Sequence, residues 1–142
     1  MFEKLIKSLR AAGLQASAAE MFAGYYFDGA EHGRAFPVVR AEAEYSFPVK
    51  RLEGICKRWG LVFDRYYHYG CGVVIFTVWA ADDRAEARRL DNIALAFRGA
   101  FEKEHNRQYI ESGRTDCILP GADVAACVAA GRAAVAALGV NE

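Results

Sequence analysis

The sequence has few of the residues that usually mark a metal site, a disulfide framework or a nucleic-acid surface. Among 142 residues there are only four cysteines and three histidines, and 18 basic residues balance 18 acidic ones. Without a charge excess or zinc-ligand spacing we expect no metal, no cofactor and no nucleic acid. The thiols should be reduced, and they are those of Cys56, Cys71, Cys117 and Cys127.

Long apolar runs and catalytic motifs are also absent. No stretch is long enough to cross a bilayer, and the N-terminal MFEKLIKSLRAAG mixes charged with apolar residues, unlike the apolar centre of a secretory signal. No P-loop, dinucleotide fingerprint or H-E-x-x-H motif occurs. These absences predict a cytoplasmic protein without membrane contact, and they leave its reaction, if it has one, undetermined.

The length of the chain is typical of one domain. We find no internal repeat and no linker, and expect a single domain over residues 1–142. Its parts are a helical N-terminal extension over 1–34, a core over 37–119 and an Ala-rich C-terminal helix over 122–138.

Two helices are predicted in the N-terminal extension. The first has apolar residues at helical spacing over 2–12 and ends at Gly13. The second is predicted because Ser17 and Glu20 have the spacing of a capping box and bulky residues follow them.

The core has the element order of a ferredoxin-like fold, β-α-β-β-α-β. We therefore predict an α+β fold with an antiparallel sheet, two extra N-terminal helices and the Ala-rich C-terminal helix. With Gly70-Cys71-Gly72 as the hairpin loop, Tyr69 pairs with Val73, and a two-residue loop is the alternative. The predicted elements of the core are a strand at 37–46, a helix at 48–59, strands at 61–69 and 73–80, a helix at 82–109 and a strand at 115–119.

Polar side chains on two of these strands form a candidate binding site. A strand places residues i, i+2 and i+4 on one face, and among them is a histidine, which titrates near neutral pH. What covers the second face of the sheet is open, and no motif supplies an oxyanion hole, so no catalytic residue is assigned. The candidate ligand-binding residues are Arg40, Glu42, Glu44, Asp64, Tyr66 and His68.

The stretch YGCGVVIF, residues 69–76, resembles the third-strand signature of RNA-recognition motifs. The resemblance implies a sheet on which aromatic side chains stack against bases. In this sequence Cys71 and Val73 stand where that signature has its stacking aromatics. The first strand presents Glu42 and Glu44, which would repel phosphate. An RNA-recognition-like binder is therefore our third hypothesis.

Two hypotheses rank ahead of it. The favoured one is a non-catalytic binding or assembly module whose sheet contacts a second subunit, a protein partner or a small ligand. The alternative is a small enzyme or ligand sensor with a pocket on the second face of the sheet. We also expect a homo-oligomer, because the apolar strands and helices offer more apolar surface than one sheet needs.

Overall fold

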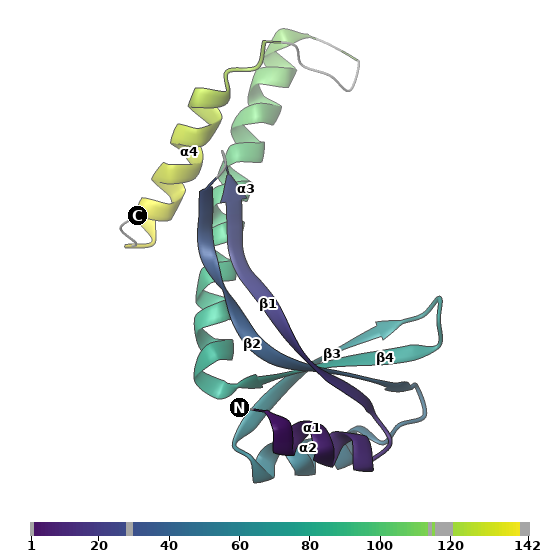
Figure 1. Ribbon diagram of the computed structural model, residues 1–142. Coiled ribbons are helices and arrows are strands. Elements are labelled where there is room, and N and C mark those ends of the chain that lie inside the picture. Colours follow the sequence, from purple (N-terminus) through teal and green to yellow (C-terminus); the bar gives the residue numbers. More distant parts are fainter. Residues whose placement is uncertain (1, 28–29, 114, 116–120, 140–142) are drawn as a thin grey trace. The chain divides into compact units, whose positions relative to one another are not determined.

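The structure is a computed structural model that describes residues 2–27, 30–113, 115 and 121–139. In this part of the chain the protein is α+β, with a four-stranded antiparallel sheet in the order β1-β2-β4-β3. Its elements, in chain order, are α1 (Glu3–Ala11), β1 (Gln15–Phe27), β2 (Ala30–Glu44), α2 (Val49–Arg58), β3 (Leu61–His68), β4 (Val73–Ala80), α3 (Ala81–Ser112) and α4 (Val124–Ala137) (Figure 1).

The ferredoxin-like prediction is wrong. A ferredoxin-like chain follows a strand with a helix twice, whereas here α1 and α2 are each followed by a pair of strands. The error begins at β1, which we predicted as the second N-terminal helix. Ser17 and Glu20 are exposed strand residues, and Gly24 has a φ of 121°, which no α-helix contains. The predicted strand at 115–119 falls outside the described residues, apart from Thr115.

Other predicted elements are confirmed. The first helix is α1, the helix after the first strand is α2, and the hairpin strands are β3 and β4. The long helix and the Ala-rich helix are α3 and α4. The helices were identified by the spacing of their apolar residues, and the hairpin strands by their β-branched and aromatic residues on either side of a glycine-rich loop.

The segment from α1 to β4 consists of two α-β-β halves. The second strand of each half, β2 or β4, lies at the centre of the sheet, and β1 and β3 lie at its edges. Both helices are followed by a glycine with positive φ, as is common at helix C-termini. The α-β-β order therefore occurs twice between α1 and β4, a structural repeat that our sequence analysis did not find. At a constant offset, Leu5 matches Leu52, Leu9 matches Cys56, Gly13 matches Gly60 and Leu14 matches Leu61.

The chain divides into two compact units. The first comprises Met1–Ala23 and Gly33–Arg88, and the second comprises Gly24–His32 and Arg89–Glu142. The expectation of a single domain stays a prediction.

In the first unit, α1 and α2 lie side by side and cover one face of the sheet (Figure 1). Burying each leucine side chain contributes about 1.5–3 kcal/mol. This core fixes which face of the sheet is left for other contacts. Its buried residues include Leu5, Leu9, Leu52 and Cys56 from the helices, and Val39, Ala41, Val74, Phe76 and Val78 from the strands.

The core of the second unit is built on stacked rings. Tyr25 lies between His32 and Phe97, with ring centroids 4.6 and 4.5 Å away. On α4, Gly131 lies against the same phenylalanine, because a Cβ there would be 2.7 Å from two of its ring carbons. The lack of a side chain at this position lets α4 approach α3 closely.

Candidate functional site

The candidate residues lie in three rows across the sheet. Both β2 and β3 pair with β4, and residues directly opposite each other in an antiparallel sheet share a face. All six candidates therefore share one face with three residues of β4, on the side away from α1 and α2. We call these nine residues the open face. Its rows are Arg40, Thr77 and Asp64; Glu42, Ile75 and Tyr66; and Glu44, Val73 and His68.

The register of the hairpin differs from the predicted one. The loop has four residues, Tyr69 to Gly72, and His68 pairs with Val73. The amides of Cys71 and Gly72 both donate to the carbonyl of His68, each at 3.1 Å. The predicted pairing of Tyr69 with Val73 is therefore wrong. As a result, the candidates of β3 lie beside Val73, Ile75 and Thr77 instead of the buried Val74, Phe76 and Val78.

The start of α3 limits the open face at one end. Trp79, in the next row, is 4 % exposed, and its ring packs on Phe36 at a centroid distance of 6.0 Å. The guanidinium of Arg84 lies 5.2 Å from the centre of the Trp79 ring and forms an ion pair of 2.8 Å with Asp64. Beyond this cover, Val73 and Ile75 are only half-buried.

The charges of the open face are only partly paired. Arg40 and Glu42 form a partly exposed ion pair of 3.1 Å on β2, and Asp64 is held by Arg84. Glu44 is exposed and has no ion-pair partner among the described residues. The row nearest the hairpin loop therefore offers an unpaired carboxylate beside the apolar side chain of Val73.

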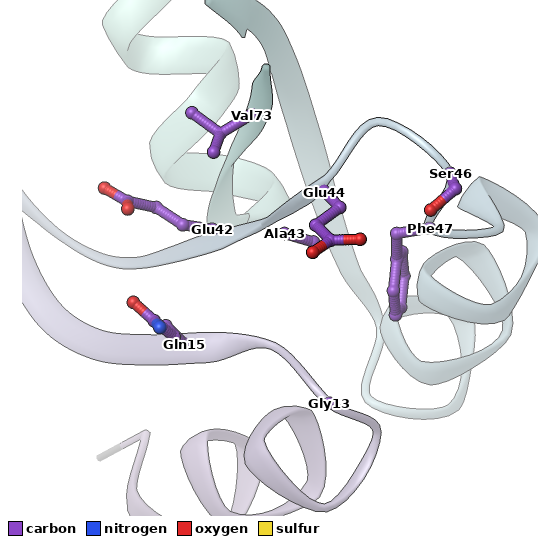
Figure 2. Close-up of a pocket in the computed structure, with 8 residues that line it drawn as sticks. All are labelled: Gly13, Gln15, Glu42, Ala43, Glu44, Ser46, Phe47 and Val73. Atoms are coloured by element: carbon purple, nitrogen blue, oxygen red, sulfur yellow. The ribbon is translucent and has the colours of Figure 1, made fainter. Parts of the chain in front are cut away.

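A hollow of about 480 Å³ lies at this end of the open face. Figure 2 shows the side chains of Gln15 and Glu42 pointing to the same side from neighbouring strands. The hollow combines carboxylates and an amide with apolar groups, which suits a cation attached to an apolar body. Our sequence analysis missed Gln15 and Phe47 because one lies in the unrecognised β1 and the other in a loop. The lining residues are Gly13, Gln15, Glu42, Ala43, Glu44, Ser46, Phe47 and Val73.

The tyrosines near the hairpin loop have a packing role. The ring of Tyr45 lies edge-on to those of Tyr67 and Tyr69, at centroid distances of 5.6 and 6.0 Å. Burial raises the pKa of the Tyr45 hydroxyl, and the nearby Tyr69, Cys71 and Tyr66 add to the shift. These contacts attach the segment after β2 to the hairpin.

Groups that could react lie far apart. Burial raises the pKa of the Cys56 thiol to about 11, so this thiol is protonated at neutral pH. His68 lies edge-on to Tyr66, with ring centroids 6.2 Å apart. Asp64 lies four residues before His68, about 13 Å along the strand, and is paired with Arg84. The open face thus presents binding groups without a connected acid and base.

No protein family, curated protein or solved structure matches this chain. Within the described residues, no group of three or more His, Cys, Asp or Glu side chains is arranged to hold a metal ion. No helix in the same part of the chain is long and apolar enough to span a membrane.

Proposed function

We propose that the chain is a non-catalytic binding module that holds a protein partner on the open face. The observation that carries this proposal is the uneven cover of the sheet. One face is buried under α1 and α2, whereas the other leaves Val73 and Ile75 half-buried between the polar residues of β2 and β3. An apolar centre with a polar rim is typical of protein interfaces.

The partner contact that fits this surface is basic and apolar. Glu44 offers an unpaired carboxylate, and Glu42 lies one row away. Tyr66 is 63 % exposed and gives an aromatic surface for a guanidinium or an aliphatic stem. A peptide segment with a lysine or arginine beside an aliphatic residue satisfies all three features.

Two observations rank this proposal above its rivals. Catalysis has little support, because Asp64 is engaged with Arg84 and is distant from His68. The RNA-binding hypothesis has less support, because Glu42 and Glu44 lie on the open face and would repel phosphate. A cytoplasmic location belongs to the proposal and is supported by the free thiols of Cys56, Cys71 and Cys127.

The test is a titration with a synthetic peptide that alternates lysine and leucine, followed by amide chemical shifts. We expect saturable shifts in residues 40–44, 64–68 and 73–77. Glu44→Gln should weaken binding roughly tenfold, because a hydrogen bond to a charged group contributes about 1.5–3 kcal/mol. Glu53→Gln, an exposed position on α2 on the other side of the sheet, is the matched control. Shifts centred on α1 and α2, or equal weakening by both variants, would refute the proposal.

The hollow favours a second candidate, a ligand-sensing module. Its volume of about 480 Å³ lies within the roughly 300–1,000 Å³ of small-molecule sites. A small amine would place its charge at Glu44 and its apolar part against Phe47. A thermal-shift screen of aliphatic and aromatic amines tests this candidate. A hit whose effect persists in Glu44→Gln would count against it.

A further inference from the structure

We propose that β1 is a dimerisation edge, to which a second copy of this chain adds its own β1 in the antiparallel sense about a twofold axis at Ala19. In the described sheet β1 and β3 are the two edge strands. An edge strand presents unpaired backbone N–H and C=O groups that can pair with another chain. This edge is distinct from the open face, so the two proposals stand or fall separately.

The two edges differ in how they are protected. Proteins usually block an edge with charged residues, prolines or cover from other elements. β3 carries Asp64 and Arg65 within eight residues, and Arg84 reaches its side chains. Over the 13 residues from Gln15 to Phe27, β1 has no proline and a single charged residue, Glu20. The side chains of Arg10 and Asp91 bind the backbone of β1 only at Ala16 and Gly24, so the edge between them lacks the features that keep other strands away.

The central part of β1 is uncovered on both faces. Within residues 17–22 only Ala19 is half-buried, and the others are exposed. Met21 and Phe22, which point to opposite faces, are 43 % and 44 % exposed. A strand of a complete sheet usually buries at least one face. These apolar side chains would be covered if the sheet continued into a second copy.

The segment is complementary to itself in size and charge. Its residues before Ala19 are small and those after it are large. Antiparallel pairing about Ala19 places each large residue opposite a small one, and Glu20 faces alanine instead of another Glu20. A shift by two residues about an axis at Glu20 would set the two carboxylates directly opposite each other, which is unfavourable. The pairs are Phe22 with Ala16, Met21 with Ser17, and Glu20 with Ala18.

The contact of Arg10 agrees with this register. Its Nε donates to the carbonyl oxygen of Ala16 at 3.0 Å. We infer that the carbonyl of Ala16 forms no hydrogen bond with β2 and points away from the sheet. The backbone N–H and C=O groups of the other even-numbered residues of β1 near Ala19 then point away from β2 as well. Ala18 and Glu20 of the partner then form a hydrogen-bonded pair. The two Ala19 residues form a non-hydrogen-bonded pair, with Cα atoms about 4.5 Å apart.

The first test compares the same substitution at adjacent positions, with mass measured by light scattering. Ala19→Lys puts two ammonium groups opposite each other at the axis and should give a monomer. Ala18→Lys puts the new ammonium group opposite Glu20 of the partner and should keep the dimer. Circular dichroism checks that both variants are folded. A wild-type monomer, a dimer that survives Ala19→Lys, or loss of the dimer in both variants overturns the proposal.

The second test is disulfide trapping in a chain with Cys71→Ser and Cys117→Ser. Cross-strand neighbours have Cβ atoms about 4.5–5.5 Å apart, close to what a disulfide requires. Ala19→Cys should therefore give a covalent dimer with oxidised glutathione, and dithiothreitol should reverse it. Val62→Cys, on the exposed part of the β3 edge, is the control and should give no covalent dimer. Equal cross-linking of both variants would show random collision and would overturn the proposed pairing.

Discussion

The two α-β-β halves between α1 and β4 share their core positions and differ at their edges. Leu5 and Leu52 are buried at 2 % and 0 % exposure, and each helix is followed by a glycine of positive φ. The edge strands have no such agreement, since β1 has a single charged residue, Glu20, among 13, whereas β3 has two, Asp64 and Arg65, among eight. The repeat thus explains the fold. The proposed binding surfaces lie where the halves differ, which is the open face beside β3 and the edge of β1.

The largest expected effect tests the equivalence of the two halves. Leu5→Ala and Leu52→Ala should each lower the free energy of unfolding by about 2–5 kcal/mol, because both empty a fully packed position. Urea denaturation measures the change. Leu95→Ala, at a position 63 % exposed, is the control and should be nearly neutral. If one core variant were as mild as this control, the halves would not be equivalent.

A smaller effect distinguishes the two glycines that follow the helices. Among the described residues, apart from the chain neighbours of each glycine, no atom lies within 4 Å of a Cβ built at Gly13 or Gly60, so the cost of alanine is that of the backbone alone. Gly60 has a φ of 66°, within the left-handed helical region, whereas Gly13 has a φ of 95°, outside it. Gly60→Ala should cost about 1 kcal/mol, and Gly13→Ala should cost more. Thermal unfolding of both variants, with Gly60→Asn as a milder control, checks this order; the reverse order would contradict it.

The repeat also shows why part of the fold was predictable and part was not. Helices α2 and α3 were identified because the spacing of their apolar residues lies within each segment, and β4 because its β-branched and aromatic residues do. β1 was missed because Ser17 and Glu20 imitate a helix cap, and because an edge strand exposed on both faces lacks a clear alternation. Its strand conformation depends on pairing with β2, which no local window contains. Matching Leu5 and Gly13 with their counterparts in the second half would have revealed it.

The candidate site, like the fold, could be predicted only in part from the sequence. That Asp64, Tyr66 and His68 share a face follows from strand alternation, which is local. What they face depends on the hairpin register, and the four-residue loop changed their neighbours from buried to half-buried ones. The hollow could not be predicted from the sequence, because only the tertiary structure brings Gln15 and Phe47 next to Glu44.

Equivalent positions on the edge strands should respond differently to loss of a polar group. Asp64 matches Ser17 in the repeat, but only Asp64 has an ion pair, with Arg84 at 2.8 Å. Because the Asp64 side chain is 39 % exposed, Asp64→Asn should cost no more than about 1 kcal/mol, and less at high salt. Ser17→Ala should be neutral. Denaturation at low and high salt measures both, and a loss for Asp64→Asn that does not depend on salt would contradict the ion-pair explanation.

The smallest effect concerns the second unit. There the tested interaction is the ion pair between Arg107 and Glu104 on α3 and not the burial of a leucine. Hydrogen bonds from Arg107 and Gln108 lower the pKa of Glu104 from 4.5 to about 2. Because the folded pKa is the lower one, this contact stabilises the fold above pH 4.5, and the stabilisation is lost as the pH falls through about 2. Glu104→Gln should therefore lower the melting temperature at neutral pH, where the contact is intact, and flatten the acid limb, so that the variant and the wild type converge as the pH approaches about 2. Glu102→Gln, a nearby exposed position on α3, is the matched control and should keep the wild-type acid limb. The explanation fails if Glu104→Gln keeps that limb or if Glu102→Gln also flattens it.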